Sequence, residues 1–201
     1  MRNRVALVSI SVILALVFPV PAHADAIVFA DSDDTASRLD IRWVQQGHAC
    51  RQADCRLRHK IRTFEAWPRR LLDGHEAFVR ILFDISGDAE VDRILRVWVD
   101  DSGAFVAQLR TLDGRRVAGH NPRVRKTNRY TLLIDIDRAA LLGADWYRWQ
   151  ADTVWGDPDG VGPCGMRPDG HVFSCVDRAP QEGPAVHGDC GPLSEIGVCP
   201  R

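Results

Sequence analysis

The stretch Val79-Arg-Ile-Leu-Phe-Asp-Ile85-Ser-Gly-Asp88 decides the fold class of this chain. Apolar residues occupy every second position from Val79 to Ile85, which is the period of a strand with one buried face. Ser86-Gly87-Asp88 then supplies residues that favour a turn. The stretch therefore predicts a β-strand that ends in a tight connection.

The same pattern recurs along the chain. Further strands are predicted over residues 39–44, 56–65, 94–99, 104–109, 130–136 and 146–155. Asp101-Ser-Gly103 and Asp113-Gly114 lie between such runs, and Asp-Gly between short apolar runs is a strong hairpin signal. Residues 91–98 also fit an apolar helical face, but Val97-Trp-Val99 and the turn after it favour a strand. Residues 137–142 predict one short helix.

Short strands about ten residues apart, joined by turns, predict an all-β protein. We expect an antiparallel β-sandwich. Periodicity does not predict the order of the strands, so the sandwich could be immunoglobulin-like or jelly-roll-like, and a barrel is the alternative. The core is expected to hold one apolar face of each strand. Its predicted members are Ile81, Phe83, Leu95, Val97, Leu132 and Ile134.

Residues 1–24 have the layout of a secretory signal peptide. Arg2 and Arg4 precede an apolar segment over 5–20, and Ala22-His-Ala24 places small residues at a cleavage site. The apolar segment is shorter than the ~20 residues that a membrane span needs, and no later segment is long and apolar enough. We expect a soluble, secreted (extracellular or periplasmic) chain that starts near Asp25.

The charge balance does not favour a nucleic-acid partner. The formal net charge is −1, and loss of two arginines with the signal peptide would make it −1 − 2 = −3. The remaining arginines are scattered among acidic residues, whereas nucleic-acid sites cluster their basic residues.

Six cysteines follow the signal segment, and an even number in an exported chain indicates disulfides. They form three pairs that are close in sequence: Cys50–Cys55, Cys164–Cys175 and Cys190–Cys199. A zinc site is the alternative, but the chain has no C-x-x-C pair. We expect a sandwich domain over 25–160 and a disulfide-stapled C-terminal extension over 161–201 that packs on the same domain.

Five short motifs occur in a particular order along residues 31–180. They are Leu39-Asp-Ile41, Arg62-Thr-Phe-Glu65, Phe83-Asp84…Gly87-Asp88…Asp92, Tyr147-Arg-Trp-Gln-Ala151 and Cys175-Val-Asp-Arg-Ala-Pro180. In this order they resemble a group of uncharacterised secreted bacterial proteins, which are similar to the DOMON and family-9 carbohydrate-binding-module type of β-sandwich. The resemblance implies a sandwich with a carbohydrate ligand. It does not extend to the haem ligands of cytochrome-type DOMON domains, because Met166 is the one methionine after the signal segment.

Asp84, Asp88 and Asp92 flank the predicted turn at Gly87 and are candidate metal ligands. Ca²⁺ takes six to eight oxygen ligands, which carboxylates, backbone carbonyls and water could supply here. Solvated turns are also rich in acids without any metal. The sequence therefore suggests a structural Ca²⁺ at this turn, and it offers Asp31-Ser-Asp-Asp34 and Asp157 with Asp159 as further acidic groups.

Trp146, Trp149 and Trp155 are the candidate ligand-binding residues, because exposed aromatic rings on a sheet can stack on sugar rings. Large aromatic residues of all-β domains also fill cores, which is the alternative. The chain has no G-x-S-x-G or H-E-x-x-H motif. We therefore expect a secreted non-enzymatic module that binds carbohydrate or a cell-envelope component, with a small hydrolase using Asp or Glu carboxylates as the alternative.

Overall fold

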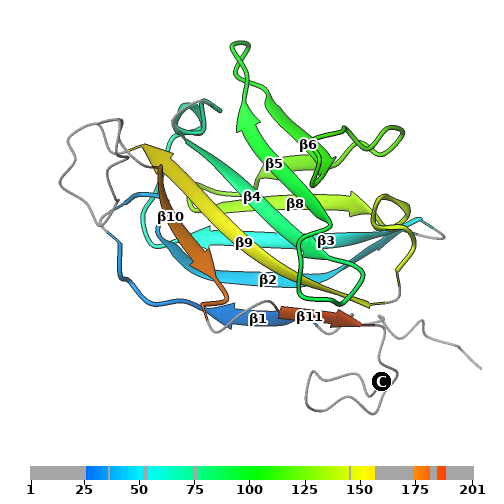
Figure 1. The fold of residues 1–201 in the computed structure, drawn as a ribbon. Helices are drawn as coiled ribbons and strands as arrows, with labels where there is room; N and C mark the ends of the chain where they lie inside the picture. The colour runs from blue at the N-terminus through cyan, green and yellow to red at the C-terminus, as the bar shows by residue number, and fades with distance from the viewer. Residues whose placement is uncertain are drawn as a thin grey trace, which may run out of the picture.

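The fold consists of two antiparallel sheets stacked face to face (Figure 1). The computed structural model describes residues 26–35, 37–51, 54–74, 77–144, 146–156, 174–181 and 185–188. The first sheet, here called the β3 sheet, has five strands in the order β1-β2-β3-β8-β7. Its strands are β1 (Ile27–Ala30), β2 (Ile41–Arg51), β3 (Asp54–Thr63), β8 (Thr131–Asp137) and β7 (Arg123–Lys126).

The second sheet, here called the β4 sheet, has the order β10-β9-β4-β5-β6, and β11 also pairs with β9. Its strands are β10 (Ser174–Ala179), β9 (Trp146–Gly156), β4 (Ala77–Asp84), β5 (Arg93–Val99), β6 (Phe105–Thr111) and β11 (Ala185–Gly188). Its strands run obliquely across those of the β3 sheet (Figure 1). The predicted all-β antiparallel sandwich is therefore confirmed.

Two short 3-10 helices interrupt the strands, η1 (Arg69–Leu71) and η2 (Arg138–Leu141). The second lies where the sequence predicts a helix. The Asp137 carboxylate accepts the N–H of Ala139 at its start, and Leu142 ends it in the left-handed conformation with φ of 60°. In the part of the chain that the structure describes, no helix is long and apolar enough to cross a bilayer.

The core lies between the sheets, where alternate residues of each strand point inward. All six predicted core residues are 0% or 1% exposed, which confirms the predicted strand faces. The segment with the helix–strand ambiguity is strand β5, and Leu95 and Val97 are its inward residues. Truncation of a buried phenylalanine such as Phe83 is expected to cost about 3–5 kcal/mol.

An aromatic cluster occupies the middle of this core. The His59 ring is fully buried and lies 4.9 Å from the Trp149 ring and 5.7 Å from the Phe83 ring, centre to centre. Tyr147 packs against Phe83 at 5.6 Å, edge to face. The cluster joins strand β3 of one sheet to β4 and β9 of the other, so it fixes how the two sheets stack.

The cysteine pairs are only partly within the described residues. Cys50 and Cys55 face each other across the β2–β3 hairpin as Cα partners. Cys175, in β10, is buried and disulfide-bonded. The pairings Cys164–Cys175 and Cys190–Cys199 involve residues outside the described ones and stay predictions.

Candidate functional site

The predicted calcium turn, residues 84–92, joins β4 to β5, and its carboxylates accept hydrogen bonds from the turn itself. Asp84 is only 6% exposed. Its two oxygens accept the N–H groups of Gly87 at 2.5 Å and Ala89 at 3.0 Å. An Arg148 nitrogen lies 3.7 Å from the same carboxylate. The buried charge of Asp84 is thus satisfied by the protein alone.

Asp92 and Asp88 also accept hydrogen bonds from backbone N–H groups of this turn. Asp92 Oδ2 accepts the N–H groups of Ile85 at 2.6 Å and Ser86 at 2.8 Å. Burial alone would raise the pKa of Asp92, but the hydrogen bonds from Ser86 and Ile85 outweigh it and hold that pKa below its usual value. Asp88 Oδ1 accepts the Glu90 N–H at 2.8 Å. All three predicted ligands therefore stabilise the turn by hydrogen bonding.

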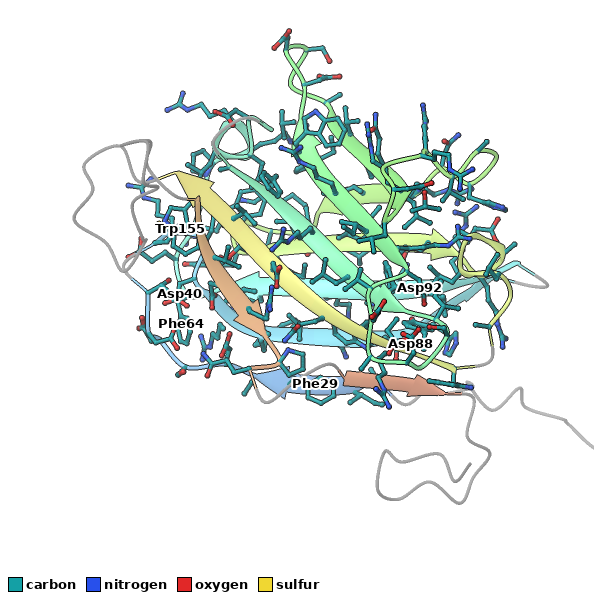
Figure 2. All side chains as sticks on the ribbon, viewed as in Figure 1. Phe29, Asp40, Phe64, Asp88, Asp92 and Trp155 are labelled. Carbon is teal, nitrogen blue, oxygen red and sulfur yellow. The ribbon has the colours of Figure 1, made fainter. Side chains whose placement is uncertain are left out.

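A different acidic group has the close geometry of a metal site. Among the described residues, Asp34, Asp40 and Asp177 are the one group of three His, Cys, Asp or Glu whose ligand atoms lie within 4.8 Å of one another. The acids of the 84–92 turn do not form such a group. Figure 2 shows Asp40 on the opposite side of the sandwich from Asp88 and Asp92. A calcium ion at the 84–92 turn stays a prediction.

The three predicted ligand-binding tryptophans lie at different depths. Trp149 is 1% exposed and belongs to the aromatic cluster. Trp155 is half-buried and packs against the core. Trp146 is 40% exposed and covers the turn, since a Cβ at Gly87 would lie 2.1 Å from its ring. Of the three, Trp146 is the one with a substantially exposed ring.

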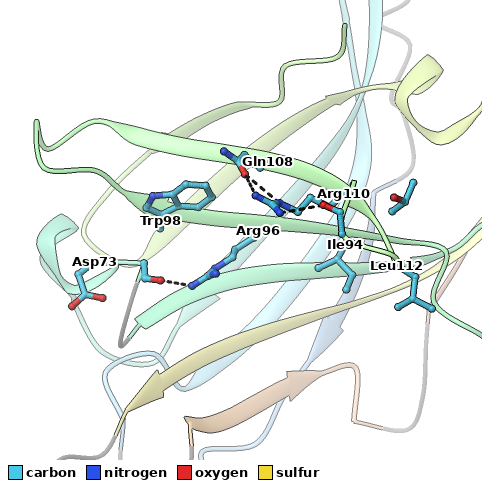
Figure 3. A pocket seen from close by; sticks show the side chains of 10 residues that line it. Asp73, Ile94, Arg96, Trp98, Gln108, Arg110 and Leu112 are labelled. Carbon is cyan, nitrogen blue, oxygen red and sulfur yellow. Dashed lines mark hydrogen bonds between the residues drawn. The ribbon is translucent and has the colours of Figure 1, made fainter. Parts of the chain in front are cut away.

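A groove that the sequence reasoning missed lies on the outer face of the β4 sheet, over β5 and β6 (Figure 3). Its volume is about 470 Å³. Its lining includes an indole, two guanidinium groups, an amide, two aliphatic side chains, one hydroxyl and one carboxylate. These belong to Trp98, Arg96, Arg110, Gln108, Ile94, Leu112, Thr111 and Asp73.

Arg96 forms the floor of the groove. Its guanidinium group lies over the Phe78 ring, 3.9 Å from the ring centre, and donates to the Gly74 carbonyl. Its Nε is buried and has no acceptor. Burial, followed by repulsion from Arg110 and Arg80, lowers the pKa of Arg96 below its usual value. The floor of the groove therefore carries a partly desolvated cation.

Arg110 lies beside it and is held by neutral groups. It donates to Gln108 Oε1 at 2.8 Å and to the Gly114 carbonyl at 3.1 Å. No carboxylate of the described residues forms an ion pair with Arg96 or Arg110. The groove thus combines two guanidinium groups with one carboxylate, that of Asp73, which forms no ion pair with either arginine.

The neighbouring arginines on the same face differ in this respect. Asp152 is fully buried and forms ion pairs with two arginines. Its Oδ2 lies 2.6 Å from Arg80 Nε, and its Oδ1 lies 2.7 Å from Arg178 Nε. Each of these two cations therefore has a carboxylate partner, which they share. Arg96 and Arg110 differ from them because neither forms an ion pair with a carboxylate of the described residues.

The groove could have been found from the alternation that identified its strands. Residues 94, 96 and 98 of β5, and 108 and 110 of β6, share the outward face, and that face carries large polar and aromatic side chains. What the sequence does not show is that they enclose a hollow. The chain matches no protein-family model, no curated protein and no solved structure.

Proposed function

We propose that this protein is a secreted, non-enzymatic binding module whose ligand is an acidic carbohydrate of the cell envelope, held in the groove over β5 and β6. The observation that carries the proposal is the presence of two arginines, Arg96 and Arg110, that form no ion pair with a carboxylate of the described residues and lie beside the Trp98 indole.

The chemistry of these side chains suits an acidic sugar. An indole offers a flat apolar surface that can pack on the C–H face of a sugar ring. Guanidinium groups bind carboxylate, sulfate or phosphate through paired hydrogen bonds, and Arg96 still has a free Nε donor. Gln108 adds an amide that can bind hydroxyl groups.

A paired-carboxylate hydrolase finds less support in this groove. Such enzymes place two carboxyl groups about 5–9.5 Å apart across the bond they cleave. Of the described residues that line the groove, Asp73 alone has a carboxylate. A binding role therefore explains the lining better than hydrolysis does.

Export supports a ligand outside the cytoplasm. The signal-like residues 1–24 and the even number of cysteines both indicate an oxidising compartment. Envelope and extracellular polysaccharides are common there and often carry uronic-acid or sulfate groups.

The test is binding of the full chain to polygalacturonate and to a neutral β-glucan, measured by calorimetry and affinity electrophoresis. We expect binding to the acidic polymer that weakens as NaCl is raised, because charged groups carry part of the affinity. Trp98→Ala and Arg110→Gln should each weaken it by roughly tenfold, which corresponds to about 1.4 kcal/mol.

Trp146→Ala is the matched control, because Trp146 is an exposed tryptophan that does not line the groove. It should bind like the wild type. Equal binding of both polymers, or a larger loss in Trp146→Ala than in Trp98→Ala, would contradict the proposal.

A further inference from the structure

We propose that Asp34, Asp40 and Asp177 bind one divalent cation, calcium by the chemistry of the site, between the β1–β2 loop and β10. We call Asp31, Asp34, Asp40 and Asp177 the acidic cluster. Three of its members lie in the loop between β1 and β2, and Asp177 lies in β10 of the other sheet.

The fold brings these distant residues together through two contacts between the sheets. The Asp177 carboxylate accepts the N–H of Ile41, the first residue of β2. Thr153 of β9 donates to the Leu39 carbonyl at 2.8 Å. These bonds hold the 31–40 loop against β10, so the carboxylates converge from two sheets on one point.

The spacing of the carboxylates fits an ion between them. One ligand atom from each of Asp34, Asp40 and Asp177 lies within 4.8 Å of the others. Oxygens on opposite sides of a calcium ion are about 5 Å apart, since each Ca–O distance is about 2.3–2.6 Å. All candidate ligands are oxygens, which hard cations such as calcium prefer.

Asp40 gives an independent indication of a missing positive partner. It is 1% exposed. Its Oδ2 accepts the N–H of Thr35 at 3.2 Å, but its Oδ1 is buried and receives no hydrogen bond from any residue that the structure describes. Asp31 Oδ2 and Thr35 Oγ1 are likewise buried without a partner. Buried oxygens without partners are costly, and a bound cation would satisfy several at once.

The electrostatics of the cluster point the same way. The carboxylates of Asp34, Asp40 and Asp177 lie close together, and those of Asp40 and Asp177 are almost completely buried. No Arg, Lys or His of the described residues forms an ion pair with the cluster. The cluster therefore concentrates negative charge that no described side chain neutralises.

Accessibility favours an ion over a larger ligand. Asp40 and Asp177 are 1% and 3% exposed, so a polysaccharide cannot reach both. Asp34 is exposed, and its Oδ2 accepts hydrogen bonds from Gln181 at 2.6 Å and Ser32 at 3.2 Å. It gives a small cation and its waters a route to the buried carboxylates.

The experiment uses the full chain after treatment with chelator. Calorimetric titration with CaCl₂ at pH 7 should show one ion per chain. At a calcium concentration about 100-fold above the Kd, the Tm should rise by about 5–10 °C relative to EDTA. The same concentration of MgCl₂ should raise it less, because magnesium demands a stricter octahedral geometry.

The variants locate the site. Asp40→Asn should lose the calcium-dependent rise, and so should Asp34→Asn, whose exposed position leaves the folded chain intact. Asp88→Asn, at the opposite turn, should keep it. The proposal is overturned if the wild type shows neither heat nor a Tm rise at 10 mM CaCl₂, or if Asp34→Asn keeps the rise. An equal rise with magnesium would overturn the assignment to calcium.

Discussion

The 84–92 turn and the acidic cluster are both rich in aspartates, but their carboxylates have different hydrogen-bond environments. The 84–92 turn surrounds its carboxylates with backbone N–H groups, and Arg148 lies beside Asp84. The acidic cluster leaves buried oxygens of Asp31 and Asp40 without donors. The number of nearby backbone N–H donors, rather than the number of acids, therefore distinguishes a turn that satisfies its own carboxylates from a candidate cation site.

The largest effect on the free energy of unfolding is expected at the 84–92 turn. Asp84→Ala should lower the free energy of unfolding by about 3 kcal/mol, because it leaves two N–H groups and Arg148 without their acceptor. Denaturation in urea, with and without calcium, measures this. A loss below 1 kcal/mol would mean that the turn does not depend on its central carboxylate.

Asp40→Asn should change the free energy of unfolding in the opposite direction, in EDTA at pH 7. The amide removes a buried negative charge, so we expect the unfolding free energy to rise by about 2 kcal/mol relative to wild type without calcium. The same urea experiment detects it. A variant less stable than wild type in EDTA would show that Asp40 is already satisfied as a carboxylate.

The two segments should also respond oppositely to pH. Burial raises the pKa of Asp40, so the folded chain keeps a proton that the unfolded chain has lost. In EDTA the contribution of Asp40 to the free energy of unfolding therefore falls as pH rises from about 4 to the folded pKa of about 7. The fall is up to ~1.4 kcal/mol per pH unit per proton. Asp31 and Asp177 add to this fall up to about pH 6.

The lowered pKa of Asp92 gives stability that is present above its unfolded pKa and lost as pH falls through its folded pKa. Stability curves for wild type and Asp40→Asn between pH 4 and 8 separate the two contributions. If the curves are parallel in EDTA, Asp40 does not titrate as described.

The smallest effect is expected at Asp88. It is exposed and accepts one N–H, from Glu90, so Asp88→Ala should change the unfolding free energy by less than about 0.5 kcal/mol. Its calcium response should equal that of wild type. A calcium response that disappears in this variant would instead support the calcium site predicted at the 84–92 turn.

The features that could be predicted from the sequence are the longer strands and their buried faces, because both follow from local periodicity. Alternating apolar residues predicted the inward faces of β4, β5 and β8, and all six core residues predicted on these strands are buried. Strands β1, β7 and β11 have four residues each, too few for a period to be visible. The sequence of residues 137–142 was sufficient to predict a short helix, which the structure shows as the 3-10 helix η2.

The candidate sites depended on pairings between distant segments. Asp31 and Asp34 were recognised as an acidic group, but their partner Asp177 comes from β10, whose position beside β2 no local pattern encodes. Likewise, Trp98 was placed on a strand, yet the hollow beside it exists only because β5 and β6 pair in one register. The spacing of residues along the sequence predicts neither the approach of Asp177 to Asp31 and Asp34 nor the hollow beside Trp98.

The edges of the two sheets bear on how the chain behaves at high concentration. An exposed strand edge can pair with another molecule and begin aggregation. The described edge strands β1, β7 and β11 have four residues each and β10 has six, whereas β6 has seven. The segment after β6 folds back so that Val117 donates to the Leu109 carbonyl and Arg116 bridges to Arg110. The longest edge is thus partly covered by its own chain, which limits strand-to-strand association between copies.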